Sequence, residues 1–248
     1  QESIPEIAFQ AIAPFVEGSI PENELRKIIE ETLDFDFPIV PISNQMGTLE
    51  LFQGPTLAFK DVGARFMARC LGYFNRENTS QKITVLVATS GDTGGAVANG
   101  FLGVPGIEVV ILYPKGKVSE VQEQQLTTLG QNITALEVDG VFDDCQDMVK
   151  TAFLDEDITK HKQLTSANSI NVARWLPQMF YYFIAYRALK KINKPLVVSV
   201  PSGNFGNICA GLMAREIGLP IDHSIASTNI NDVVPDFLSS GVYTPKKS

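Results

Sequence analysis

One lysine carries the clearest chemical signal in this 248-residue chain. Lys60 lies between a Gly54-Pro55 turn and a run whose apolar residues recur at helical spacing. An amine held at the start of a helix by a rigid turn can lose its proton more easily than a free one and attack an aldehyde. An amine and an aldehyde form a Schiff base, and pyridoxal phosphate, an electron-sink cofactor with an aldehyde group, is bound to enzymes through a Schiff base with a lysine. The alternative interpretation is a solvated charge in the first turn of a helix.

A second candidate is the glycine-rich segment 201–207, with the sequence PSGNFGN. It follows the apolar, strand-like run 196–200 and precedes apolar residues at helical spacing. A turn at this place presents backbone N–H groups, at the positive end of a helix dipole, to an anion. The segment has neither the Gly-Lys-Ser/Thr ending of a nucleotide loop nor a Gly-x-Gly-x-x-Gly pattern, so a small phosphate monoester fits better than ATP or NAD. The alternative is a plain turn that needs glycine.

A third loop, 89–95 with the sequence TSGDTGG, follows the buried apolar run 83–88 and opens another helical pattern. Its N–H groups and hydroxyls suit a carboxylate. Two anion-binding loops and one nucleophilic lysine together predict an enzyme that uses pyridoxal phosphate on an amino acid. One loop would hold the cofactor phosphate, and the other would hold the substrate carboxylate.

Four motifs in order carry a family resemblance: 50–61 (ELFQGPTLAFKD), 88–94 (ATSGDTG), 166–171 (SANSIN) and 201–207 (PSGNFGN). They resemble the longer-chain branch of the threonine synthases, which are fold type II, tryptophan-synthase-β-like pyridoxal enzymes. The resemblance runs from about residue 20 to the last residue. Family members extend further at both ends, so we expect a fragment lacking N- and C-terminal parts.

The resemblance implies an α/β protein with two α/β domains and the cofactor in a cleft between them. We expect an N-terminal helical segment (1–47), a large cofactor-binding domain (48–80 and 166–248) and a small inserted domain (81–165). Alternating strand and helix patterns indicate parallel sheets covered by helices. The expected strands are 83–88, 108–113, 133–138 and 196–200, and the expected helices are 119–129, 142–154 and an interrupted stretch from 171 to 192. The segment 19–22 resembles a helix capping box.

The resemblance also assigns site residues. Lys60 is the expected catalytic residue and the attachment point of the cofactor. The other expected cofactor-binding residues are Asp92, Ser202, Gly203, Asn204, Phe205, Gly206 and Asn207. The expected substrate-binding residues are Ser90, Gly91, Thr93, Gly94, Lys117, Asn168, Ser169, Asn171 and Arg174. The candidates for the substrate phosphate are Lys117, Asn168, Ser169, Asn171 and Arg174. The Arg174 guanidinium could donate two parallel hydrogen bonds to a phosphate, and the alternative for Lys117 and Arg174 is a surface charge.

Asp92 departs from the wider fold, in which related enzymes commonly have Asn beside the phenolic oxygen of the cofactor. An ionised carboxylate there would repel a phenolate. Asp92 is therefore expected either to be protonated or to turn toward backbone N–H groups or the phenol proton of the cofactor, and its role is left open.

The reaction that the resemblance implies converts O-phosphohomoserine and water to L-threonine and phosphate, by γ-elimination followed by β-addition. Lys60 then serves as one movable base. One alternative is a related pyridoxal phospho-amino-acid lyase or threonine dehydratase. A second is a non-catalytic module that binds an anion or cofactor, in which Lys60 is structural.

The composition of the chain narrows the remaining classes of function and partner. A net charge of −8 argues against nucleic acid and against an anionic membrane surface, and no apolar run is long enough to cross a bilayer. The three cysteines are predicted to be reduced core thiols of a cytoplasmic protein. With only two histidines, neither a metal site nor a Ser-His-Asp hydrolase is expected. The expected partner is a small phospho-amino acid, and the oligomeric state is left open.

Overall fold

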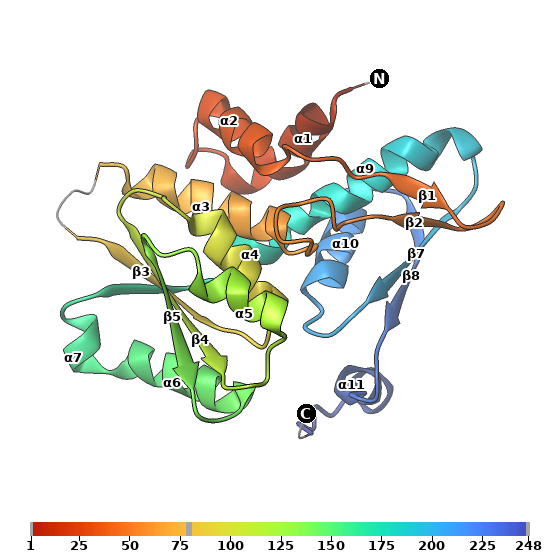
Figure 1. Cartoon of the computed structure of the whole chain (residues 1–248). Helices are drawn as coiled ribbons and strands as arrows, with labels where there is room; N and C mark the ends of the chain where they lie inside the picture. Colours follow the sequence, from red (N-terminus) through yellow and green to blue (C-terminus); the bar gives the residue numbers. More distant parts are fainter. Residues whose placement is uncertain (1, 78–80, 247–248) are drawn as a thin grey trace.

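A four-stranded parallel sheet forms the centre of one half of the molecule, in the order β5-β4-β3-β6 (Figure 1). The computed structural model describes residues 2–77 and 81–246. The strands are β3 (Ile83–Ala88), β4 (Ile107–Pro114), β5 (Ile133–Val138) and β6 (Gln163–Ser166). Their connections are helical, as parallel strands require. They are α4 (Asp92–Phe101), α5 (Glu120–Thr127), α6 (Phe142–Leu154) and the short α7 (Glu156–Thr159).

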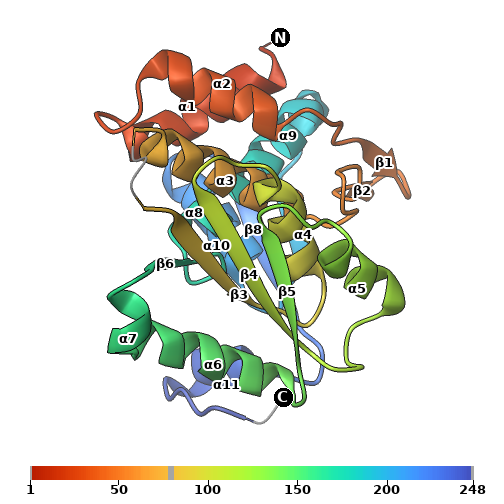
Figure 2. The same ribbon diagram turned by 60° about the vertical axis from the view of Figure 1, so that its left-hand side comes forward.

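Both faces of this sheet are covered, which explains why β3 is buried along its whole length. Ile83, Val85 and Val87 point into one apolar core with α4 and α3 (Asp61–Asn75). Leu86 and Ala88 point the other way, into a smaller core with α6. Figure 2 shows α3 and α4 on one side of β3 and β4, with α6 on the other. At its carboxyl end, Ala88, β3 leads directly into the 89–95 loop.

The second half of the molecule is built around the parallel pair β7 (Leu196–Pro201) and β8 (Ile221–Ser227), connected by α10 (Gly206–Glu216). The segment from Val172 is interrupted at Pro177 as expected. It comprises α8 (Val172–Trp175), two 3₁₀ turns (Leu176–Gln178 and Lys190–Ile192) and α9 (Met179–Leu189). A last helix, α11, spans Val233–Ser240.

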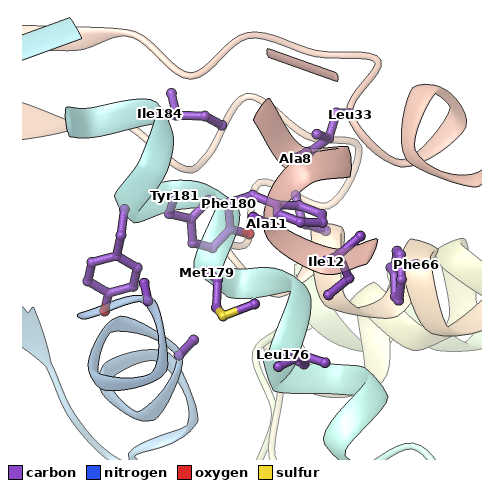
Figure 3. Close-up of a cluster of buried hydrophobic side chains, with 14 of the residues drawn as sticks. Ala8, Ala11, Ile12, Leu33, Phe66, Leu176, Met179, Phe180, Tyr181 and Ile184 are labelled. Carbon is purple, nitrogen blue, oxygen red and sulfur yellow. The ribbon is translucent and has the colours of Figure 1, made fainter. Parts of the chain in front are cut away.

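The N-terminal helices α1 (Ile4–Val16) and α2 (Glu22–Thr32) pack on α9 and α3. Figure 3 shows Ile12 of α1, Phe66 of α3 and Phe180 of α9 in this core. The capping-box prediction for α2 was wrong, because its N-cap is Pro21, which has no side chain able to accept a hydrogen bond. A hairpin of β1 (Ile39–Pro41) and β2 (Gly47–Leu49) follows.

Helix α3 belongs to both cores. Val62 and Phe66 pack with α1 and α9, whereas Ala64 and Met67 pack with β3 and α4. A helix with two apolar faces is buried on both sides, and its first residue is fixed relative to both halves of the molecule. The predicted strands, helices and parallel pairing are confirmed. The domain boundaries stay predictions. The expected boundary after residue 47 falls within the hairpin β1–β2, and the expected boundary after residue 165 falls one residue before the end of β6 at Ser166.

The described cysteines are all free, but they are not all core thiols. Cys70 and Cys145 are buried, and burial raises the pKa of the Cys70 thiol to about 12. Cys209 is exposed on α10, so the prediction for that residue was wrong. Within residues 2–77 and 81–246, no helix has the length and apolar character needed to span a bilayer.

Candidate active site

Lys60 is the N-cap residue of α3, as the sequence predicted for a lysine at a helix start. The loop before it is fixed by Asp61, whose carboxylate accepts hydrogen bonds from the Thr56 N–H, at 3.0 Å, and from the Thr56 hydroxyl. Tyr181 of α9 donates a hydrogen bond to the Phe59 carbonyl. The backbone next to the lysine is therefore held by two buried polar side chains.

The Lys60 amine donates a hydrogen bond to the Thr93 hydroxyl oxygen at 3.0 Å, which joins the start of α3 to the first turn of α4. Burial lowers the pKa of this amine; Asp92 acts in the opposite direction, and the Arg174 guanidinium lowers it further. Loss of the proton makes an amine nucleophilic. Lys60 is therefore not a freely solvated surface charge, and its environment suits covalent chemistry.

The 89–95 loop is organised by the buried hydroxyl of Thr89, at the end of β3. This hydroxyl accepts hydrogen bonds from the N–H groups of Gly91, at 3.0 Å, and Gly94, at 2.9 Å. Those two N–H groups were expected to bind a substrate carboxylate, and they bind Thr89 instead. Ser90 is exposed, and Thr93 faces Lys60. The substrate roles assigned to this loop stay predictions.

Asp92 is exposed at the N-terminus of α4. Its Oδ1 atom accepts a hydrogen bond from Gln122 Nε2 at 2.7 Å, a side-chain donor that was not among those expected for this residue. The role of Asp92 toward the cofactor stays a prediction.

The 201–207 loop enters α10 through an unusual backbone conformation. Phe205, its N-cap residue, has a φ of 59°, in the left-handed region that non-glycine residues rarely adopt. Gly203 and Asn204 are exposed. A Cβ built at Gly203 would have no heavy atom within 4 Å, so there is open space over the loop. Strain of this kind is common where a ligand is bound.

Two of the polar side chains expected to bind the cofactor in this loop, Ser202 and Asn207, form hydrogen bonds within the protein. Ser202 is buried and donates to the Val200 carbonyl at 2.9 Å. The Oδ1 atom of Asn207 accepts from the Tyr182 hydroxyl at 2.6 Å, which leaves its NH₂ group as the donor. The contacts of both side chains with a phosphate stay predictions. The NH₂ group of Asn207 is a donor that could bind a phosphate oxygen.

Helix α8 lies between the lysine helix and this loop. The Arg174 carbonyl would be 2.1 Å from a Cβ at Gly63 of α3, and the Trp175 Cβ would be 3.4 Å from a Cβ at Gly206. The close approach to α3 is possible only because residue 63 is glycine.

Arg174 itself is 4 % exposed, so a surface charge is excluded. Its Nε and Nη1 atoms have no hydrogen-bond partner among the described residues. Burial lowers the pKa of the guanidinium to about 10. A buried cation with unpaired donors is costly unless a ligand pairs with it, so Arg174 fits an anion site.

The other candidates for the substrate phosphate lie in different surroundings. The side-chain amide of Asn168 forms two hydrogen bonds with the backbone of Ala88. Its NH₂ group donates to the Ala88 carbonyl at 2.8 Å, and its oxygen accepts from the Ala88 N–H at 3.3 Å. Asn171 caps α8 and donates to the Ser166 carbonyl at 3.0 Å. Both amides therefore hold the end of β6 against β3 and α8. Ser169 and Lys117 are exposed.

Residues 47–244 match the family model described as "Pyridoxal-phosphate dependent enzyme". The chain belongs to this family.

Among curated relatives of this pyridoxal-phosphate enzyme is a threonine synthase of Escherichia coli (strain K12), 48% identical over 236 residues, or 95% of this chain and 54% of the relative. A threonine synthase of Buchnera aphidicola subsp. Baizongia pistaciae is 51% identical over 239 residues, which cover 96% of this chain and 55% of the relative. The chain spans about half the length of the curated relatives it matches.

Solved structures give the same likeness. The E. coli threonine synthase structure has a TM-score of 0.90 at 46% identity, covering 99% of this chain and 57% of that one. A threonine synthase structure from Brucella melitensis, described as bound to PLP, has a TM-score of 0.91 at 40% identity. The match covers 99% of this chain and 54% of the Brucella chain. The predicted fold type II architecture and the resemblance are confirmed.

The residues of this pyridoxal-phosphate enzyme fit the cofactor. Lys60 supplies a partly buried amine with a lowered pKa for the aldehyde. The exposed Gly203 and the N-terminus of α10 supply open space and N–H groups for a phosphate. The unpaired buried donors of Arg174 supply a place for a second anion.

Sequence reasoning missed four residues that arrange this site: Thr89, Gln122, Tyr181 and Tyr182. Thr89 stood inside a quoted motif, and its position at the end of a buried strand was the available signal. The two tyrosines lie in the helical stretch expected from 171 to 192, and helical periodicity does not predict where a hydroxyl points. No pattern in the sequence related Gln122 to residue 92, because the two are 30 positions apart.

Proposed function

We propose that this chain is part of a threonine synthase, which converts O-phosphohomoserine and water to L-threonine and phosphate. The observation that carries the proposal is the Lys60 amine, partly desolvated and held at 3.0 Å by Thr93 of the 89–95 loop. The threonine synthases named above support the choice of reaction, since they match nearly the whole of this chain.

Bound pyridoxal phosphate supplies an electron sink for a carbanion next to the substrate amine. Lys60 would anchor the cofactor through its Nζ atom, and the same atom would accept the proton from the substrate α-carbon. The depressed pKa of Lys60 increases the fraction of neutral amine available as this base. The 89–95 loop orients the substrate carboxylate through donors other than the Gly91 and Gly94 N–H groups, which bind Thr89. Arg174 pairs with an anionic group of the substrate or cofactor.

A first experiment tests cofactor attachment separately from turnover. The chain is incubated with pyridoxal phosphate, reduced with borohydride and digested, and the Lys60 peptide is examined for the mass of a reduced pyridoxyl group. Lys60→Ala should abolish the label, and Lys115→Ala, which removes an exposed lysine, should retain it. A label that survives Lys60→Ala, or no label on the unmodified chain, would contradict the assignment of Lys60.

A second experiment tests the substrate. Products are identified after incubation of the loaded protein with O-phosphohomoserine or with O-phosphothreonine. Threonine and phosphate from the first compound support a threonine synthase. Phosphate and a keto acid, without threonine, would indicate the related lyase or dehydratase. Labelling of Lys60 without any product would indicate a cofactor-binding module.

The proposal includes the setting of the reaction. We infer a cytoplasmic enzyme, in keeping with the free cysteines of the described residues. Its partner is a small phospho-amino acid rather than nucleic acid or a membrane, in keeping with a net charge of −8.

A further inference from the structure

Gln122, in the first turn of α5, reaches across to the 89–95 loop. Its Nε2 atom donates to Asp92 Oδ1 at 2.7 Å. The same atom would lie 2.6 Å from a Cβ at Gly91, which has a φ of +153°. Gln122 therefore lies directly over the turn that begins α4, and glycine at 91 leaves the space for it.

The orientation of the Gln122 amide is fixed by its own helix. Its oxygen accepts hydrogen bonds from the Ser119 N–H, at 3.3 Å, and from the Ser119 hydroxyl, at 3.1 Å. This is a capping box, completed by the Gln122 N–H donating to the Ser119 hydroxyl oxygen. Because the amide oxygen is engaged by Ser119, the NH₂ group must face Asp92. The capping box thus delivers a donor, rather than an acceptor, to the carboxylate.

We propose that Gln122 is a positioning residue, which holds the Asp92 carboxylate in place beside Lys60. This inference rests on the proposed function of Lys60 and deepens it. A carboxylate at a helix N-terminus is free to rotate among solvent-exposed positions, and a directed donor restricts it to one. The side chain that acts on the lysine is Asp92, and Gln122 acts through it.

The charges around the Lys60 amine agree with this arrangement. Asp92 favours the protonated amine, while burial and the Arg174 guanidinium favour the neutral one. Thr93, the next residue after Asp92, accepts the hydrogen bond from the amine. A displacement of Asp92 therefore changes the balance at the same helix turn that positions the amine.

The test measures the pKa of the Lys60 amine in the protein without added cofactor. The protein is labelled with fluorodinitrobenzene over a range of pH, and the rate is followed on the Lys60 peptide by mass spectrometry. Gln122→Leu should lower this pKa, with a rise of about threefold in the labelling rate at pH 8, which corresponds to roughly half a pH unit. Gln124→Leu, an exposed change on the same helix, should leave the rate unchanged.

The decisive comparison repeats Gln122→Leu in an Asp92→Asn background, where it should have no further effect on Lys60. An equal effect with and without Asp92 would overturn the proposal, because loss of the capping box would then explain it. No effect on Lys60 in the unmodified background would also overturn it.

Gln122→Glu separates positioning from helix stability. Glu preserves the capping-box acceptor for Ser119, so the melting temperature should stay unchanged, but it cannot donate to an ionised Asp92. The charge that Glu adds acts on Lys60 with or without Asp92, so Gln122→Glu is also measured in the Asp92→Asn background. The change in labelling rate should differ between the two backgrounds, and an equal change in both would overturn the proposal. None of these measurements needs cofactor or turnover, so failure of the proposed reaction would be recognised separately.

Discussion

Tyr182 holds Asn207 through its hydroxyl, which lies 2.6 Å from the Asn207 Oδ1 atom and 2.9 Å from its carbonyl oxygen. Its neighbour Tyr181 donates to the carbonyl of Phe59, immediately before the lysine. Burial raises the pKa of both phenols, so they stay protonated and donate. Two adjacent residues of α9 therefore fix the lysine loop and the glycine-rich loop to the same helix.

Tyr182→Phe should weaken the attachment of the 201–207 loop with only a modest loss of stability. Removing one hydrogen bond costs about 1 kcal/mol of the free energy of unfolding, because the Asn207 carbonyl can bind water instead. We expect weaker retention of pyridoxal phosphate, measured by dialysis and absorbance, and a small shift in a urea unfolding curve. Tyr186→Phe, on the same helix, is the control for loss of a hydroxyl. Equal retention in the two variants would show that Asn207 needs no anchor.

Alanine at Gly203 or Gly206 should reduce cofactor retention much more than folding. A Cβ at Gly203 meets no protein atom within 4 Å, and one at Gly206 meets the Trp175 Cβ at 3.4 Å, an ordinary contact. The free energy of unfolding should therefore change by about 0.5 kcal/mol or less. A methyl group in the open space would instead obstruct a phosphate on the α10 N–H groups. Stability and pyridoxal phosphate affinity measured on the same samples test this, and unchanged affinity in both variants would place the phosphate elsewhere.

Gly63→Ala should destabilise the protein strongly and disturb Arg174. The added Cβ would be 2.1 Å from the Arg174 carbonyl oxygen, a backbone atom that cannot move without moving α8. Overpacking of this kind costs about 1–3 kcal/mol of the free energy of unfolding. Urea unfolding measures the loss, with Gly203→Ala as the matched glycine substitution that meets open space. A stability equal to that control would mean that α3 and α8 are further apart than described.

Lys60→Met should stabilise the protein near neutral pH, and the advantage should fade in alkaline solution. The folded-state pKa of Lys60 lies below its ordinary value of 10.5, chiefly through burial. Below the folded pKa, the folded protein bears the full cost of a buried ammonium group. As the pH rises through the folded pKa toward 10.5, the native state has already released its proton, and the stability of the unmodified protein rises.

The measurement is urea unfolding of both proteins at pH 7 and at pH 10. The difference between them should be larger at pH 7. Lys115→Met, at an exposed position, should show the same difference from the unmodified protein at both pH values. A Lys60→Met advantage that grew with pH would mean that the folded-state pKa is raised.

The amino-acid sequence alone determined the family, the lysine and many of the elements, but not the hairpin β1–β2, β6, β8 or α11. Periodic apolar residues gave the strands 83–88 and 133–138 and the helix 142–154 at their observed bounds, because burial on a fixed period is a local property of the chain. The loops around Lys60, Gly91 and Gly203 were found for the same reason, since each is a short run with its own turn chemistry.

Only the tertiary structure decided which polar groups remain free at the site. Asn168 and Asn171 have the chemistry of ligand donors, yet their amides bind the backbone of neighbouring segments. Arg174, equally suited to solvent by its type, is buried with unpaired donors. Hydrogen bonds such as that from Gln122 to Asp92 join residues far apart in the chain. Their geometry depends on how α5, α8 and α9 pack, and a local pattern contains no information about that packing.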